Sequence, residues 1–262
     1  MLLSISNISW NMSEDEIMYS SMKEIGFEGI EIAPTRIIPD KPYDNIAYSI
    51  EWAKEIYNRY GFTIPSMQSI WYGRSERLFG SEDERKTLIE YTMKAVDFAE
   101  AIGCGNLVFG CPRNRIVPDG VDVMSSVKFF RTIGNYAAAH RTVIAMEANP
   151  PIYNTNYIND TASAIELIEN VESEGFKLNL DTGTMIENGE SISILRGKEK
   201  FINHVHVSEP GLKPIQRRAL HTELAEFLRE TGYERFVSIE VGRQKYIGSL
   251  IDMMKYVKEI FG

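Results

Sequence analysis

Residues 175–207 read GFKLNLDTGTMIENGESISILRGKEKFINHVHV. The apolar runs Phe176–Leu180 and Ile202–Val207 predict two β-strands. The segment between them is too long for a hairpin and long enough for a crossover helix, so the two strands are expected to run parallel. This strand–helix–strand unit predicts an α/β protein.

The same unit recurs along the whole chain. Six further β-rich apolar runs are separated by intervals of similar length, which makes eight predicted strands in all. The additional six are Leu2–Ile8, Gly29–Ala33, Phe62–Ser69, Asn106–Gly110, Thr142–Ala148 and Phe236–Val241. No linker or change of composition divides them, so we predict a single-domain (β/α)8 barrel, a TIM barrel, over residues 1–262. A doubly wound sheet is less favoured because the first turn, Asn7–Met12, contains no glycine.

Local signals support the helices. Ser13–Glu16 and Ser81–Glu84 fit the capping box. Apolar residues spaced by three and four predict one buried face on the helix after Ser81 and another on the last helix. Glycines just before several strands predict left-handed helix ends, at Gly26, Gly61, Gly103, Gly175 and Gly232.

Composition narrows the class of protein. The chain has 262 residues, with 28 Lys+Arg against 37 Asp+Glu and a net charge of −9, which argues against nucleic acid as a partner. Its only cysteines, Cys104 and Cys111, indicate neither a disulfide framework nor a thiolate metal cluster. No signal peptide and no apolar run long enough for a membrane span are recognisable, so we expect a cytoplasmic protein without a membrane partner.

Four polar residues lie at or next to the C-terminal ends of the later predicted strands: Glu147, Asp181, His206 and Glu240. In a barrel these positions converge at the C-terminal mouth, where active sites lie. Charged side chains in apolar strands are costly unless they are paired or bind a metal. Three carboxylates and an imidazole suit one divalent ion, for which we favour Mn²⁺ over Mg²⁺, Co²⁺ or Zn²⁺. Asp181 alone would also fit a helix cap. His204 is expected on the side of its strand opposite His206, packed or in a supporting role.

The segments Met146–Asn149, Leu180–Thr184, His204–Glu209 and Ser238–Glu240 together resemble the xylose-isomerase-like TIM barrel family of sugar and sugar-phosphate isomerases and epimerases. The resemblance covers the whole chain. It implies that Glu147, Asp181, His206 and Glu240 bind one metal ion. It also implies that Glu147 and Glu240 are the catalytic acid/base pair on opposite faces of a hydroxy-ketone, and that the protein forms a homodimer or homotetramer.

The chemistry has a physical rationale. A metal held by a carbonyl and its neighbouring hydroxyl acidifies the α-proton and stabilises an enediolate. A carboxylate can remove that proton, and a second one can return it. We therefore predict a metal-dependent isomerase or epimerase of a small sugar, keto-polyol or sugar phosphate, active in carbohydrate metabolism.

Two positions depart from the family's ketose 3-epimerases. Thr184 stands where they usually have a histidine, and Leu212 where they usually have an arginine. In those epimerases the histidine and the arginine normally help to hold the substrate. Their replacement here favours a substrate other than a free ketohexose.

Six residues are candidates for binding that substrate: Gln68, Trp71, Arg113, Asn149, Lys213 and Arg243. Trp71 would form an aromatic wall, or else a packing contact between loop and barrel. Arg113, with Arg115, would clamp an anion through its planar fork, or else lie in a solvated loop. Arg243 would supply a cation near the metal, or else form a surface ion pair. Asn149 would orient a metal ligand or a substrate hydroxyl.

The same residues bear on three other functions. A dehydratase of a keto-polyol, of the inosose or dehydroshikimate type, would use the same metal site to eliminate water. An apurinic-site endonuclease shares the barrel but needs three metals and extra histidines, whereas this chain has four histidines in all. A non-catalytic sugar-binding barrel would not need two glutamates on opposite sides of a metal.

Overall fold

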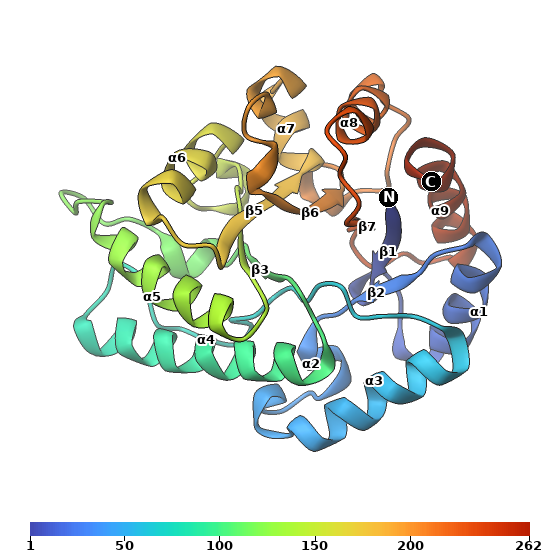
Figure 1. Cartoon of the computed structure of the whole chain (residues 1–262), viewed down its shortest axis with the longest axis horizontal. Helices are drawn as coiled ribbons and strands as arrows, with labels where there is room; N and C mark the ends of the chain where they lie inside the picture. The colour runs from blue at the N-terminus through green and yellow to red at the C-terminus, as the bar shows by residue number, and fades with distance from the viewer.

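The computed structural model describes residues 1–262 and contains one parallel sheet of seven strands. Their order is β2-β1-β7-β6-β5-β4-β3, and the sheet curls around a central axis (Figure 1). The strands are β1 (Leu2–Ser6), β2 (Gly29–Glu31), β3 (Leu107–Phe109), β4 (Ile144–Glu147), β5 (Phe176–Asp181), β6 (Ile202–Val207) and β7 (Phe236–Ile239). The predicted TIM-barrel fold is confirmed, with seven of the eight expected strands.

The eighth position is occupied by an irregular segment instead of a strand. Within the predicted run Phe62–Ser69, Thr63 and Met67 form isolated parallel bridges to β2, to the residue after β2, and to β3. The segment therefore connects the two edge strands and closes the ring. Pro65 explains the irregularity, because proline has no N–H to donate to a sheet ladder.

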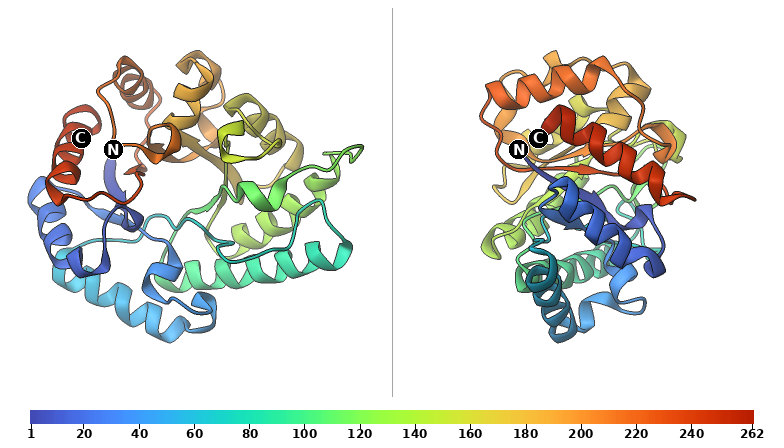
Figure 2. Two further views of the ribbon diagram at one scale, coloured as in Figure 1. Left: turned by 180° about the vertical axis from the view of Figure 1, so that it is seen from behind. Right: turned by 90° about the vertical axis from the view of Figure 1, so that its right-hand side faces the viewer.

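Nine helices surround the sheet (Figures 1 and 2). They are α1 (Asp15–Ile25), α2 (Pro34–Ile37), α3 (Ile46–Tyr60), α4 (Glu82–Ile102), α5 (Ser125–Ala139), α6 (Thr161–Val171), α7 (Thr182–Asn188), α8 (Ala219–Glu230) and α9 (Ile247–Phe261). β1 pairs with β7 and α1 contacts α9, so the two ends of the chain lie side by side. None of these helices combines the length and the apolarity needed to cross a bilayer.

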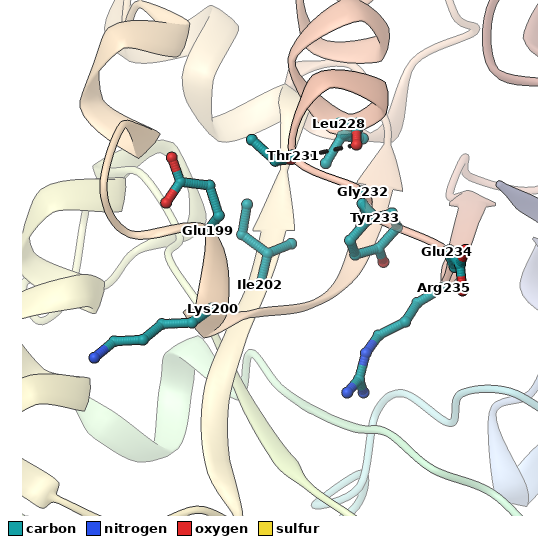
Figure 3. A pocket seen from close by; sticks show the side chains of 9 residues that line it. All are labelled: Glu199, Lys200, Ile202, Leu228, Thr231, Gly232, Tyr233, Glu234 and Arg235. Atoms are coloured by element: carbon teal, nitrogen blue, oxygen red, sulfur yellow. Dashed lines mark hydrogen bonds between the residues drawn. The ribbon is translucent and has the colours of Figure 1, made fainter.

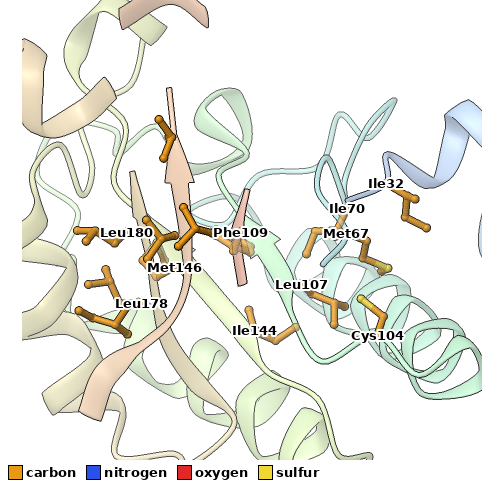
Figure 4. Close-up of a cluster of buried hydrophobic side chains, with 14 of the residues drawn as sticks. Ile32, Met67, Ile70, Cys104, Leu107, Phe109, Ile144, Met146, Leu178 and Leu180 are labelled. Carbon is orange, nitrogen blue, oxygen red and sulfur yellow. The ribbon is translucent and has the colours of Figure 1, made fainter. Parts of the chain in front are cut away.

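The main core lies between the sheet and the helices. Apolar residues of the strands alternate with polar ones, so that one set packs outward and the other lines the barrel. Figure 4 shows part of the outward set, including Leu107, Phe109, Ile144, Met146, Leu178 and Leu180, all of them buried. The barrel interior keeps the polar residues, which is where a reactive site can form.

The helix ends agree in part with the prediction. Ser81 and Glu84 form the predicted capping box, and Gly26, Gly61 and Gly103 end α1, α3 and α4 in the left-handed conformation. Ser13–Glu16 is not a capping box, because a short 3-10 turn precedes α1 and the box is made by Asn11 with Glu14.

Gly175 is not a left-handed helix end either. The helix before it, α6, ends at Val171, and its C-cap residue Glu172 adopts the left-handed conformation. A Cβ at Gly175 would lie 2.0 Å from the carbonyl oxygen of Gly134 in α5. Glycine is needed at residue 175 for this close approach of two backbones.

Gly29 at the start of β2 is a second position of close approach. A Cβ there would lie 2.7 Å from the Phe236 ring and 2.9 Å from Cδ of Pro65. We expect Gly29→Ala to lower the free energy of unfolding by about 1–3 kcal/mol, the usual effect of overpacking. Urea unfolding measures it. Gly105→Ala is the control, because nothing lies within 4 Å of that added Cβ. Equal stability of the two variants would contradict the role of Gly29.

Candidate active site

The four predicted ligands lie at the C-terminal ends of four neighbouring strands. Glu147 is the last residue of β4, Asp181 is the last of β5, His206 lies in β6, and Glu240 follows β7. In the sheet register Asp181 is opposite His206. Parallel strands bring these ends to one level, so the four side chains converge inside the barrel.

The four side chains form one compact, buried cluster. One ligand atom from each lies within 4.8 Å of those of the other three. The ring nitrogen Nδ1 of His206 is 2.9 Å from Oε1 of Glu147 and 3.3 Å from Oε2 of Glu240. The exposed fraction is 8% or less for each residue. The structure thus brings together the residues that the sequence singled out.

His206 is oriented from its other side by Glu31, the last residue of β2. Oε2 of the fully buried Glu31 lies 2.8 Å from Nε2 of His206. With the Nε2 proton donated to Glu31, Nδ1 has a lone pair to offer to a cation bound among the three carboxylates. Hydrogen bonding of the second ring nitrogen to a carboxylate is the usual support of a histidine that binds a metal.

The electrostatics of the cluster favour a cation among the carboxylates. Burial, reinforced by the charge of Glu147, raises the pKa of Asp181 above its usual value. Burial also raises the pKa of Glu240 to about 7, with Glu147 and Asp181 adding to the rise and His206 opposing it. A divalent ion relieves such carboxylate repulsion. Buried oxygen donors with one imidazole are a donor set that suits Mn²⁺, Mg²⁺, Co²⁺ or Zn²⁺, so the residues present fit a metal.

Asp181 serves both roles considered from the sequence. Its Oδ2 caps α7 by accepting a hydrogen bond of 2.7 Å from the backbone N–H of Thr184 and one of 2.9 Å from the Thr184 hydroxyl. The hydroxyl of Ser208 donates to Oδ1. Thr184 therefore holds the Asp181 carboxylate in place.

Glu147 is held by two asparagines. Nδ2 of Asn179 donates to Oε1 of Glu147 over 2.8 Å, and Nδ2 of Asn149 lies 3.2 Å from Oε2. The position of Asn149 agrees with the predicted support of a metal ligand. Asn179 was missed in the sequence, although a polar residue between Leu178 and Leu180 on the side of the strand that carries Asp181 was a usable signal.

The prediction for His204 is wrong. Residues two positions apart point to the same side of a strand, so His204 lies inside the barrel with His206. Its Nε2 is 3.2 Å from Oε2 of Glu31, and the side chain is buried. Its contact with Glu31, the residue that orients His206, is compatible with the supporting role expected of it.

A cavity of about 160 Å³ opens beside the two glutamates of the cluster. The predicted substrate-binding residues Gln68 and Asn149 line it. The remaining lining residues are Ser69, Val108, Gly110, Cys111, Pro112, Glu147, Tyr153, Leu212 and Glu240. The cavity has apolar walls with polar groups at Gln68, Asn149 and Tyr153, as is typical of small-molecule sites.

The structure does not bring Trp71 to this cavity. Its indole N–H donates to the hydroxyl of Thr92 in α4 over 2.8 Å, and its ring packs edge-on against Phe109 and Phe129. The side chain is 2% exposed. Trp71 makes the packing contact that was the alternative interpretation, because its ring is already enclosed between strand and helix.

The three predicted cations lie on the surface next to the cavity wall. Arg113 and Lys213 directly follow the lining residues Pro112 and Leu212 in the chain, and Arg243 follows Gly242, whose N–H donates to the Leu212 carbonyl over 2.8 Å. All three are exposed, and none forms a salt bridge. They are free to meet an anionic group of a ligand.

A larger hollow of about 650 Å³ lies at the opposite end of the barrel (Figure 3). It is bounded by Ile202 at the start of β6 and by Tyr233 and Arg235 just before β7. None of the four clustered residues reaches it. Because catalytic groups of such barrels lie at the C-terminal ends of the strands, the small cavity is the candidate active site.

The fold is a parallel α/β barrel, and the buried cluster at the ends of its strands is a candidate metal site. The sequence profile described as "Xylose isomerase-like TIM barrel" matches residues 20–257, and the chain belongs to this family. No curated protein sequence matches the chain.

Solved structures share the fold. D-psicose 3-epimerase from Clostridium cellulolyticum H10 has 18% identity and a TM-score of 0.77, with 100% of this chain and 99% of that chain covered. The probable 3-DHS dehydratase AsbF from Bacillus anthracis has 19% identity and a TM-score of 0.69, covering 99% and 98%. The IolI protein with a binding zinc atom has 17% identity and a TM-score of 0.72, covering 99% and 96%.

The geometry of the cluster makes the first site prediction. Asp181→Ala removes one of three carboxylates, and we expect the purified variant to lose stoichiometric divalent metal in elemental analysis. Asp160→Ala is the matched control, because Asp160 also caps a helix, α6, but lies outside the cluster. Full metal content in Asp181→Ala would exclude Asp181 as a ligand.

Proposed function

We propose that the protein is a divalent-metal-dependent isomerase or epimerase of a small sugar, keto-polyol or sugar phosphate. The observation that carries the proposal is the placement of Glu147 and Glu240. Both carboxylates line one cavity, and both lie beside the same ring nitrogen of His206. Two bases next to one cation site are what proton transfer on two faces of a substrate requires.

The metal would be held by Glu147, Asp181, His206 and Glu240. When bound, a divalent ion supplies charge that polarises the substrate carbonyl and favours an enediolate. Glu147 and Glu240 are the residues that move protons, one removing the proton beside the carbonyl and the other returning one. Asn149 and Asn179 fix the Glu147 carboxylate for this task through their hydrogen bonds.

The size of the cavity supports a small substrate. Its volume of about 160 Å³ is below the range of about 300–1,000 Å³ that is common for drug-sized ligands. Leu212 gives the wall an apolar surface, and the Thr184 hydroxyl is engaged by Ala148 and Asp181. Neither residue offers the polar contact expected in ketose 3-epimerases, which favours an anchor elsewhere at the mouth.

A screen by NMR tests the proposal. The protein is loaded with Mn²⁺ and incubated in D₂O with sugars, keto-polyols and sugar phosphates. The protein and the metal are then removed before the spectra are recorded. Deuterium at the carbon beside the carbonyl, with a new isomer or epimer, supports the proposal. Loss of water from a keto-polyol would instead support the dehydratase that one similar structure represents. Metal binding without exchange of any substrate would leave a binding protein.

The roles of the two glutamates are separable by substitution. Glu240→Gln removes one base and keeps an oxygen near the metal position, so at saturating Mn²⁺ we expect turnover to fall about 10²–10⁴-fold. In a two-base epimerase, one epimer still exchanges its α-proton through Glu147 while interconversion collapses. Wild-type turnover by the metal-saturated variant would leave Glu240 as a ligand only.

The exposed cations provide the proposed anchor for a distal anionic group. We expect Arg113→Ala or Arg243→Ala to raise KM with little change in kcat, as when a contact is equal in the ground and transition states. Steady-state kinetics on an identified phosphorylated or carboxylated substrate measures this. Arg217→Ala, which removes an exposed arginine paired with Glu259, is the control. If neither variant changes KM, the anchor lies elsewhere, with Lys213 as the next candidate.

A further inference from the structure

Arg115 is a buried arginine without a carboxylate partner. It ends the short 3-10 turn Pro112–Arg115, its exposed fraction is 0%, and none of the salt bridges of the protein includes it. A buried charge without a counter-ion is costly. The proposed function assigns Arg115 no role.

The guanidinium spans the end of β4. One nitrogen, Nη1, donates to the backbone carbonyl of Glu147 over 2.9 Å and contacts the Met146 sulfur. The other, Nη2, donates to Oδ1 of Asn149 over 2.9 Å and lies 3.4 Å from the Ile158 carbonyl. Its planar fork therefore contacts both Glu147 and Asn149.

These bonds determine which way the Asn149 amide faces. A guanidinium has donors only, so the amide oxygen of Asn149 must point to Arg115. The amide nitrogen is then directed at Oε2 of Glu147, 3.2 Å away. If the amide were reversed, its nitrogen would face the donor of Arg115 and its oxygen would face the carboxylate of Glu147.

We propose that Arg115 is a positioning residue that holds the Glu147 carboxylate through Asn149. Arg115 does not line the cavity, so it acts without touching the substrate. The inference rests on the proposed function for its effect on turnover. Its effect on the metal site depends only on Glu147 being a ligand.

A double-mutant cycle tests the pathway. Arg115→Met and Asn149→Ala should each lower kcat about 10- to 100-fold at saturating Mn²⁺, the usual range for residues that support a ligand. The double variant should be no worse than Asn149→Ala alone, because residues that act through one contact are not additive. Arg115→Met should leave KM nearly unchanged. The inference would be overturned if the kcat losses of the two single variants multiplied in the double variant. A change in KM alone, or wild-type kcat in Asn149→Ala, would also overturn it.

Metal affinity provides a readout that does not need turnover. Mn²⁺ titration against a chelating dye should show weaker binding by about 10-fold in both single variants and no further loss in the double variant. If the wild type turns over no sugar, the proposed function fails, and this titration still judges the role of Arg115. Unchanged affinity in both single variants would overturn it.

The control is Asn159→Ala. Asn159 donates to the backbone carbonyls of Asn149 and Thr155 without contacting Glu147. We expect this variant to lose stability while kcat and Mn²⁺ affinity stay near the wild-type values. Should Arg115→Met not fold, Arg115→Lys replaces it in the cycle, since lysine keeps the charge and stem but lacks the fork. If Arg115→Lys kept the wild-type kcat and Mn²⁺ affinity, the two hydrogen bonds from the guanidinium to Glu147 and Asn149 would not be needed, which would contradict the proposed role.

Discussion

The hydrogen bond between Glu31 and His206 sets the arrangement on which the candidate site depends. With Nε2 of His206 engaged by Glu31 over 2.8 Å, Nδ1 faces the carboxylates of β4, β5 and β7. Although burial disfavours a charged imidazole, Glu31 and Glu240 raise the pKa of His206 well above its usual value. The buried acids therefore favour positive charge at this place, and a divalent ion bound at Nδ1 would supply that charge in place of a proton.

The strands and the surrounding polar groups fix this arrangement. Each clustered side chain comes from the end of a different parallel strand, and two of the three carboxylates are held by polar neighbours outside the cluster. Ser208 and Thr184 hold Asp181, whereas Asn179 and Asn149 hold Glu147. Arg115, in the loop after β3, in turn holds Asn149 and the backbone of Glu147. The site is thus supported by residues from most of the barrel.

Much of this could be predicted from the sequence because barrel strands repeat and their ends converge. Apolar, β-rich runs predict eight strands, of which seven form, and the positions of Glu147, Asp181, His206 and Glu240 at the ends of those runs predict the cluster. What could not be predicted depends on three-dimensional contacts. Pro65 interrupts the eighth strand, and Trp71 turns toward α4 instead of the cavity. The burial of Arg115, although it lies in a loop that reads as solvated, follows from the long-range packing of residues 147–158 over it.

The central claim is that Glu147, Asp181, His206 and Glu240 bind one divalent ion inside the barrel. Anomalous diffraction from a crystal of the Mn²⁺-loaded protein tests it most directly, because the signal locates the ion independently of any assay. We expect a single strong peak, coordinated by one carboxylate oxygen from each acid and by Nδ1 of His206. An ion bound at another position, or no peak between these four side chains at saturating Mn²⁺, would contradict it.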